Sequence, residues 1–415
     1  MKKIFTVLLI ALMCFSALSA EETSAVDFKK EFKDEYAASS AAYLNAGSRF
    51  APTNARMAGM GGAGLSLVEA EYGLFVNPAS LAEGKLRISL PSVSVTLYHA
   101  YDALKKDSNG KNLFDKIGGD KDTLVAAVLN VVGTELAPLA SADVSASLVL
   151  PFGLGIGLYG RDTIYTYSGT AVDQLDVSLA LGYAYGLNLG DFRVSAGVTA
   201  KMNVLAFNQR LKVATVIKSE DIKEMSMNVA VGYSVPVIDF GVTGEWKKGP
   251  NDISASLVVS NLFSKYRMGI VNTSINGVGE TVKSDIKYDD FTIKTKPSVD
   301  FGLGYEFESS FVDFAVAADL TDLVGMFSSL NGGEAGRVIL RHLNTGVEVS
   351  LIDTFAFRAG MSSGYFTVGT AIDLFALRIE AAYYWNEWVR QQVREDLTVS
   401  PSASTWAMNA EANSI

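Results

Sequence analysis

Apolar and polar residues alternate with a period of two along most of the chain after residue 86. The clearest stretch is 175–186, where Leu, Val and Tyr alternate with Gly, Ala, Ser and Asp. The same alternation recurs in three further stretches: 192–202, 298–307 and 375–385. Because successive side chains of a strand point to opposite faces of a sheet, this period predicts strands with one apolar face.

The pattern divides into fourteen predicted strands: 86–99, 142–151, 153–167, 173–187, 191–205, 223–247, 252–263, 296–307, 311–321, 341–351, 354–361, 364–372, 374–387 and 402–413. We treat 223–247 as one strand through Pro236, because the connections then alternate between short and long. Short turns at one end and long loops at the other are typical of transmembrane β-barrels. The sequence therefore predicts an all-β fold, a transmembrane antiparallel β-barrel of about 14 strands.

The second face of the predicted strands is mostly small or charged, which would not fill a dry core. A barrel in a membrane turns its apolar face to lipid, and aromatic residues near strand ends, such as Tyr183 and Trp385, fit its interfacial girdles. A charge at the middle of the bilayer costs about 2–4 kcal/mol. The register should therefore turn these charged residues inward: Arg193, Lys201, Asp300, Asp313, Asp319, Arg358 and Glu380.

The first residues have the form of a secretory signal peptide. Two lysines precede an apolar run at 4–15, and small residues follow, which predicts cleavage near Ser19 or Ala20. The predicted organisation is a signal peptide at 1–20, an N-terminal extension and plug at 21–85, and the barrel at 86–415. Cys14 is the single cysteine, so the mature chain would have neither disulfides nor thiol chemistry.

The composition agrees with an exported membrane barrel. Hydrophobic residues make up 49% of the chain, the mean hydropathy is +0.21, and there are 37 glycines. No stretch after the leader approaches the roughly 20 consecutive apolar residues of a spanning helix. The formal charge of −10 opposes nucleic-acid binding through a phosphate-neutralising surface. We expect a multi-pass protein of the outer membrane of a diderm bacterium.

Residues 55–82 combine glycines with apolar side chains just before the first predicted strand. The glycines leave little room for a regular element, and Asn77-Pro78-Ala79 stops the chain before the barrel. A flexible linker would not carry so many apolar side chains that can be buried. We therefore predict a compact plug inside the lumen.

This segment resembles the N-terminal plug of the FadL-type outer-membrane transporters of long-chain fatty acids and other hydrophobic compounds. The resemblance rests on MAGMGGAG at 57–64, EYG at 71–73 and NPASLA at 77–82. VSNL at 259–262, KP at 296–297 and GLGY at 302–305 are similar more weakly. The resemblance implies a fourteen-stranded barrel with its N-terminus folded inside. It also implies passive uptake of hydrophobic small molecules, with long-chain fatty acids as the expected ligand.

Candidate ligand-binding residues lie in the plug and on the inward faces of the strands. A fatty acid buries an apolar tail and presents a carboxylate that needs cationic or backbone donors. The candidates are Arg56, Met57, Met60, Leu74, Phe75, Asn77, Pro78, Arg161, Arg193 and Lys201. Two alternatives remain open: the cations could pair with inward Asp176, Asp300 or Asp319, and the apolar residues could serve plug packing alone.

No arrangement for catalysis stands out, so we expect no enzyme, no cofactor and no metal site. Neither of the histidines, His99 and His342, stands in a recognisable nucleophile–base pattern. We expect a monomer whose partners are a hydrophobic small molecule and outer-membrane lipid. The rival functions are a porin without a hydrophobic ligand, and a surface adhesin or secretion-system partner, because a fold does not fix a ligand.

Two further features bear on access to the lumen. Apolar residues at 124–139 have mostly helical spacing, which predicts a helix in a long loop, either over the barrel mouth or packed on neighbouring loops. Pro236 and the glycine-rich third strand, with Gly153, Gly155, Gly157 and Gly160, are places where strand pairing could weaken. A ligand could leave the lumen there, or when the plug shifts.

Overall fold

The structure is a computed structural model that describes residues 55–98, 100–117, 119–132, 137–167, 169–208, 211–213, 224–276, 291–330, 335–352, 354–374, 377–389 and 392–403. The strands are β1 (Arg87–Leu97), β2 (Ala137–Val149), β3 (Leu154–Tyr167), β4 (Thr170–Leu189), β5 (Phe192–Asn208), β6 (Leu211–Lys212), β7 (Glu224–Lys248), β8 (Asn251–Leu262), β9 (Lys265–Asn276), β10 (Phe291–Lys294), β11 (Ser298–Phe307), β12 (Val312–Leu320), β13 (Leu343–Leu351), β14 (Phe355–Ser362), β15 (Tyr365–Leu374), β16 (Leu377–Val389) and β17 (Gln392–Ala403). The helices are α3 (Ala55–Gly59), α4 (Ala70–Gly73), the 3₁₀ helix η1 (Pro78–Glu83), α5 (Ala100–Leu104), α6 (Leu113–Lys116), α7 (Lys121–Val132), α9 (Leu323–Ser329) and α10 (Ala335–His342).

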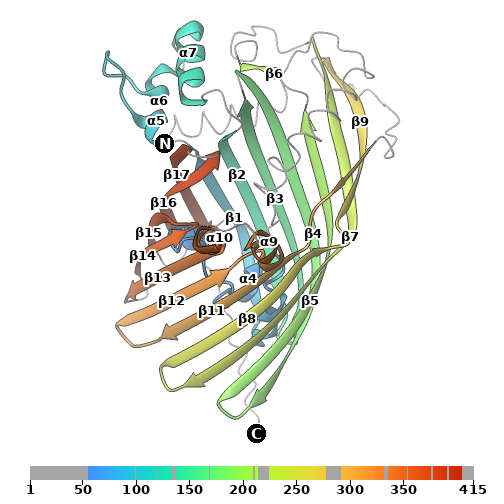
Figure 1. The fold of residues 1–415 in the computed structure, drawn as a ribbon, viewed down its shortest axis with the longest axis vertical. Helices are drawn as coiled ribbons and strands as arrows, with labels where there is room; N and C mark the ends of the chain where they lie inside the picture. The colour runs from blue at the N-terminus through green and yellow to red at the C-terminus, as the bar shows by residue number, and fades with distance from the viewer. Residues whose placement is uncertain are drawn as a thin grey trace.

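The strands form one antiparallel sheet that closes on itself, because β1 pairs with both β2 and β17 (Figure 1). β8 and β9 follow each other along β7, and β10 and β11 likewise continue one line of the wall. β6 is a two-residue strand beside β4. If β8 and β9 are counted as one wall strand, β10 and β11 as another, and β6 is left out, the described wall has fourteen strands around its circumference. The predicted fold class is confirmed.

The barrel has an apolar outside and a polar inside. On β4 and β5, Leu181 is 56% exposed, whereas Ser178, Thr199 and Asn203 are fully buried. Lys201, Asp300, Asp319, Arg358 and Glu380 are all buried, as the cost of placing a charge in lipid predicts. Arg193 and Asp313 are partly buried and lie at the end of the barrel where the turns are short. We call this end the turn end and the opposite end the loop end.

β7 runs unbroken through Pro236, as predicted, but its alternation shifts there. Ser234 and Val237 are both buried, and Val235 and Pro236 between them are exposed. The register with β5 shifts at the same place, which is the signature of a β-bulge. The bulge lets one strand of 25 residues present polar side chains to the lumen on both sides of the proline.

The predicted last strand at 402–413 is wrong. β17 spans Gln392–Ala403 and pairs with β16 from Val389↔Gln392 onward, so the predicted loop at 388–401 is mostly strand. The register brings Arg394 opposite Asn386 and Asp396 opposite Tyr384, near the loop end. Residues 404–413 lie outside the described part of the chain.

Helices occupy the loop end, and the predicted loop helix is present as α7. α5, α6 and α7 lie together on one side of that end (Figure 1), and α7 packs on α6, which agrees with packing on neighbouring loops. In the part of the chain that the structure describes, no helix is long and apolar enough to cross a membrane.

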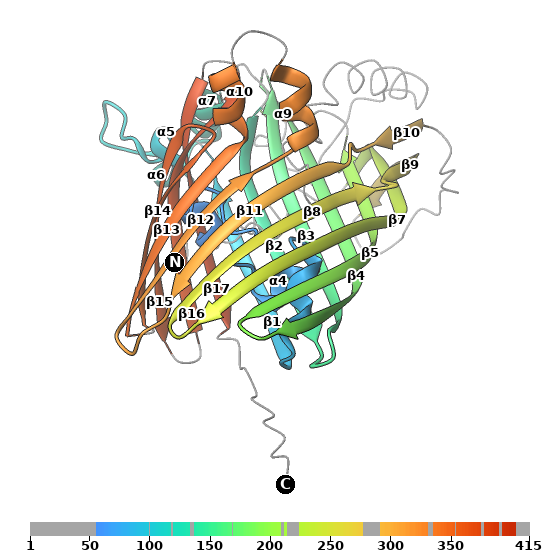
Figure 2. The same ribbon diagram turned by 60° about the horizontal axis from the view of Figure 1, so that its bottom comes forward.

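Residues 55–84 fold inside the barrel as a plug. They lie within the ring of strands, as the blue segment in Figure 2 shows, and pack against strands on both sides of the wall. Three short helices, α3, α4 and η1, are joined here by irregular turns. The predicted signal peptide and the extension up to residue 54 lie outside the described residues.

Candidate functional site

The exit of the plug into the wall is fixed by Asn77. Its side chain caps η1 by accepting a hydrogen bond from the amide of Ala79 at 3.1 Å, as its place before Pro78 favours. Its Nδ2 donates to the Leu65 carbonyl at 3.0 Å and to the Thr243 hydroxyl at 3.1 Å. One buried amide therefore links two parts of the plug to β7.

Arg56 anchors the start of the plug to the other side of the barrel. Its guanidinium lies 2.9 Å from Glu348 on β13 and 3.2 Å from Glu69 within the plug. Burial lowers the pKa of Arg56, but Glu348 and Glu69 outweigh this and raise it, so the group stays charged. Glu348 also pairs with Arg358, which in turn lies 2.9 Å from Glu380. These ion pairs form a continuous network that connects the plug to the wall.

The glycine-rich run of the plug is held through its backbone. The amides of Gly64 and Leu65 both donate to Asp319 at 2.9 Å. On the other side of the run, the hydroxyl of Thr367 donates to the Gly59 carbonyl at 2.8 Å. Two inward wall residues thus satisfy plug groups that have no helix partner, as buried backbone polar groups require.

The wall has recesses in which the plug sits. A Cβ on Gly182 would lie 2.7 Å from both Leu74 and Leu81, and a Cβ on Gly157 would lie 2.7 Å from Leu74. On the opposite side, a Cβ on Gly346 would overlap the carbonyl of Met60. Glycine at these positions lets the plug approach the strands closely.

An apolar cluster, which we call the lumenal cluster, begins on the plug and follows one side of the lumen toward the loop end. It is formed by Leu74, Phe75, Tyr159, Leu205, Phe207, Tyr266, Met268 and Ile293 with smaller neighbours, and Ile270 and Phe291 pack against it. The rings of Phe75 and Tyr159 lie 5.8 Å apart. Elsewhere the inward faces are rich in Ser, Thr, Asp and Asn. The lumen is therefore polar with one apolar side.

Three of the predicted site residues come together at the base of this cluster. Leu74 and Phe75 belong to it, and the guanidinium of Arg161 lies 5.6 Å from the centre of the Tyr159 ring. Arg161 also pairs with Asp143, to which the Tyr159 hydroxyl donates. Apolar side chains beside a cation are the combination that an amphipathic anion requires. Here the apolar side chains are buried against the plug and Arg161 is paired with Asp143.

The other predicted residues lie elsewhere. Met57 and Met60 pack in two smaller apolar groups, with Leu65 and with Ala63 respectively, and Pro78 is buried in η1. These positions agree with plug packing, and a ligand role for them stays a prediction.

The remaining cations make structural contacts. Arg193 donates to the carbonyl of Ala82 where the plug joins the wall, and Lys201 pairs with Asp239 beside the β7 bulge. The expected partners Asp176, Asp300 and Asp319 have other contacts: Asp176 accepts from Gln174, Asp300 accepts from the Asp322 amide, and Asp319 holds the plug. The lumen is salt-bridged, as one alternative proposed, with Glu348, Asp143 and Asp239 as partners of Arg56, Arg161 and Lys201.

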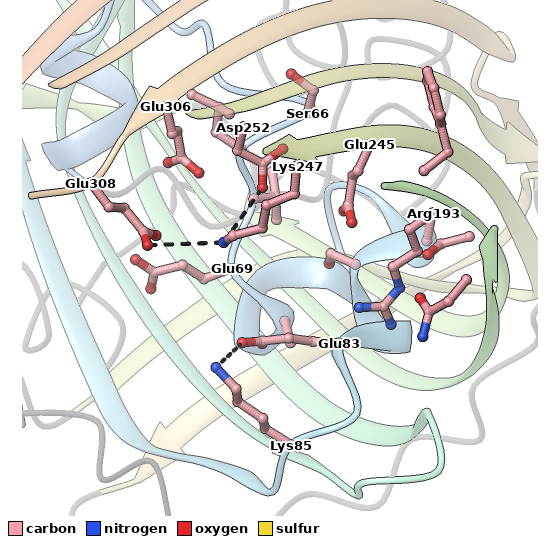
Figure 3. Close-up of a pocket in the computed structure, with 18 of the residues that line it drawn as sticks. Ser66, Glu69, Glu83, Lys85, Arg193, Glu245, Lys247, Asp252, Glu306 and Glu308 are labelled. Carbon is pink, nitrogen blue, oxygen red and sulfur yellow. Dashed lines mark ion pairs between the residues drawn. The ribbon is translucent and has the colours of Figure 1, made fainter. Parts of the chain in front are cut away.

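A charged cleft of about 630 Å³ opens beneath the plug at the turn end. Figure 3 shows carboxylates and cations facing each other across it, with Lys247 between Asp252 and Glu308, and Glu83 beside Lys85. Its lining is mostly polar. The described residues contain no group of three or more His, Cys, Asp or Glu that could hold a metal ion, and the cleft resembles a solvated vestibule below the plug.

Of the two predicted weak points in the wall, the glycine-rich third strand is not one. β3 pairs with β4 from Leu154 to Tyr167 without a register shift, and Gly155 and Gly157 accommodate plug side chains instead. Pro236 does coincide with a local shift in pairing.

Sequence reasoning missed Tyr159, Tyr266 and Phe207 in the lumenal cluster. On β3, Tyr159 follows Gly155 and Gly157 on the inward face, and that change in residue size was an available signal. On β9 the inward face is itself apolar, with Met268 next to Tyr266, so the same signal was absent there. Nothing in the sequence indicated that Glu348 and Asp143 would pair with Arg56 and Arg161, because pairing between distant residues cannot be read from the pattern of a single strand.

No family model matches this chain, and no curated protein matches it. Solved structures that are similar include the TodX deltaS2S3 mutant monoaromatic hydrocarbon channel, with 12% identity, 87% of this chain and 99% of that chain covered, and a TM-score of 0.43. Another is the translocator domain of the autotransporter NalP from Neisseria meningitidis, with 9% identity, 78% and 88% covered, and a TM-score of 0.36. At these TM-scores the likeness carries no argument about ligand or activity.

Proposed function

We propose that this chain is an outer-membrane barrel for the passive uptake of hydrophobic small molecules, with long-chain fatty acids as the ligand class to test first. In this proposal the turn end faces the periplasm and the loop end faces outward, since outer-membrane barrels have short periplasmic turns. The ligand enters at the loop end, follows the lumenal cluster down to the plug, and passes when the plug shifts.

The observation that carries the proposal is the lumenal cluster. A porin needs a water-filled lumen, and apolar side chains that face water there do not stabilise the protein. The side chains of the cluster are buried while the plug is in place. An apolar tail that covers them when the plug shifts gains about 0.8 kcal/mol per buried methylene. The resemblance of residues 57–82 to the FadL-type plug adds support from the sequence.

The clearest test of this proposal is a substitution of Arg161, the cation beside the lumenal cluster. We expect purified protein in detergent to bind radiolabelled oleate and oleyl alcohol. Arg161→Gln should lower oleate affinity about tenfold, a loss of about 1.4 kcal/mol, because the carboxylate loses its cation. Oleyl alcohol affinity should hardly change, since the apolar tail keeps its contacts.

The matched control is Arg87→Gln, because Arg87 pairs with Glu83 at the turn end, away from the cluster. The proposal is wrong if the intact protein binds neither ligand. Equal losses for both ligands in Arg161→Gln would mean that Arg161 supports the fold rather than the carboxylate. A steady open-pore current from the intact protein in a planar bilayer would favour the porin instead.

A further inference from the structure

The wall of the barrel is much lower on one side than on the other. β12 and β13 have 9 residues each, β14 has 8 and β15 has 10. On the other side, β4 has 20 residues and β7 has 25. A strand needs about 9–11 residues to cross the hydrocarbon of a bilayer. The loop-end rim above β12–β15 therefore lies where the hydrocarbon ends.

The helix pair α9 and α10 sits on this low rim. Figure 2 shows both helices at the loop end, close to the ends of β11 and β12. They are held there by hydrogen bonds to backbone carbonyls: the Thr321 amide donates to the His342 carbonyl at 2.9 Å, and the Ser363 hydroxyl donates to the Arg341 carbonyl at 2.9 Å. A Cβ on Gly364 would lie 2.9 Å from Leu340, so α10 also packs on the β14–β15 turn.

Both helices expose large apolar side chains. Val324 and Phe327 are 60% and 61% exposed, and Ile339 and Leu340 are 41% and 40% exposed. Val324 and Phe327 are three positions apart, so they share one face of α9. Below them, the outward side chains of β15 nearest the rim are apolar, with Phe366 71% and Val368 47% exposed. Exposed apolar side chains of the helices therefore lie next to the apolar outward residues at the rim of β15.

Cations accompany these apolar side chains. Arg337 and Arg341 on α10 are exposed and four positions apart, on one side of the helix. Apolar residues next to arginine, at the depth where hydrocarbon meets headgroups, are the features of a helix that lies in the membrane interface. Phosphate groups of lipid headgroups match guanidinium groups in charge and geometry.

We propose that α9 and α10 form an interfacial lipid anchor that completes the lipid-facing surface on the low side of the barrel. Val324 and Phe327 enter the acyl region of the outer leaflet, and Arg337 and Arg341 bind the phosphates of its lipids. This inference rests on the proposed membrane placement of the barrel but not on its ligand.

The test uses spin labels on the full-length protein in vesicles. Because Cys14 is the single cysteine, a Cys14→Ser background allows one label at a time, at Val324→Cys or Phe327→Cys. Labels there should be more accessible to oxygen than to a nickel chelate, at a depth of about 5–10 Å into the headgroup and acyl boundary. A label at Ser329→Cys, an exposed residue on the opposite face of α9, should show the opposite preference.

The arginines are tested in the same system. With the label at Phe327→Cys, Arg337→Gln with Arg341→Gln should make the label shallower in phosphatidylglycerol vesicles and leave it unchanged in phosphatidylcholine vesicles. Nickel accessibility at 324 and 327 equal to that at 329 would overturn the anchor, because the helices would then lie in water. Immobilisation of these labels by oleate would also overturn it, since they would face the lumen. Oleate binding itself is measured separately, so a failure here leaves the proposed function standing.

Discussion

Glu348 is the residue on which the attachment of the plug to β13 depends most. It is nearly buried and lies between two guanidinium groups, Arg56 of the plug and Arg358 of the wall. Neither cation reaches bulk water easily, since their side chains are 17% and 0% exposed. A buried pair of this kind stabilises little in net terms, but removing one partner leaves an uncompensated charge.

Glu348→Ala should therefore lower the free energy of unfolding. Breaking a buried ion pair costs about 3–5 kcal/mol, and we expect the lower end because Arg358 keeps Glu380 and Arg56 keeps Glu69. Guanidinium unfolding in lipid vesicles, followed by tryptophan fluorescence, measures the change. Glu308→Ala is the control: Glu308 is 68% exposed and 3.9 Å from Lys247, so its loss should cost less than about 1 kcal/mol. Equal effects of the two substitutions would contradict the role given to Glu348.

At the residue scale, the sequence predicted where charges point better than what they pair with. The cost of a charge in lipid was enough to turn Asp319, Arg358 and Glu380 inward. The partner of Arg56 was not predictable, because it is 292 positions away and depends on how the barrel closes.

Among the elements, the strands were the most predictable part. Alternation within one strand can be read without knowledge of the neighbouring strands. This pattern located thirteen of the fourteen wall strands, and β17 was the exception. β9 and β10 were missed, because 264–295 has mixed polarity once the wall rises above the hydrocarbon and no lipid selects its outward face. The same reasoning explains β17, whose charged residues lie at the loop end.

The recesses in the strands make a prediction about single methyl groups. Gly346→Ala should displace the plug, because the added methyl would overlap the backbone of Met60, and backbone cannot rotate away. Overpacking of this kind costs about 1–3 kcal/mol. In planar bilayers we expect transient openings that the intact protein lacks.

Gly244→Ala on β7 is the matched control, since a Cβ there would meet nothing within 4 Å. Both changes replace a strand glycine by alanine, so general effects on strand stability cancel. Openings of equal frequency in both variants would show that the recess at Gly346 does not govern the plug.

For the whole molecule, we predict that the plug keeps the barrel closed to ions. The inward faces are polar along most of the described wall, so water and ions would fill the lumen if the plug were removed. Deletion of residues 56–83 should give a large, steady ion conductance in planar bilayers, whereas the intact protein should give little. A deletion variant that conducts no better than the intact chain would mean that the loop end closes the barrel.

The contacts of the plug also impose an order on assembly. The plug precedes every strand in the chain, yet it touches early strands through Gly157 and Gly182 and late strands through Gly346 and Thr367. The late contacts span most of the sequence and can form only after the C-terminal strands arrive, which makes folding slow. Pairing of β1 with β17 closes the barrel. The plug must therefore already lie inside the curved sheet when these two strands pair. The plug is therefore a template around which the last strands are set, and its loss during biogenesis should matter more than its loss afterwards.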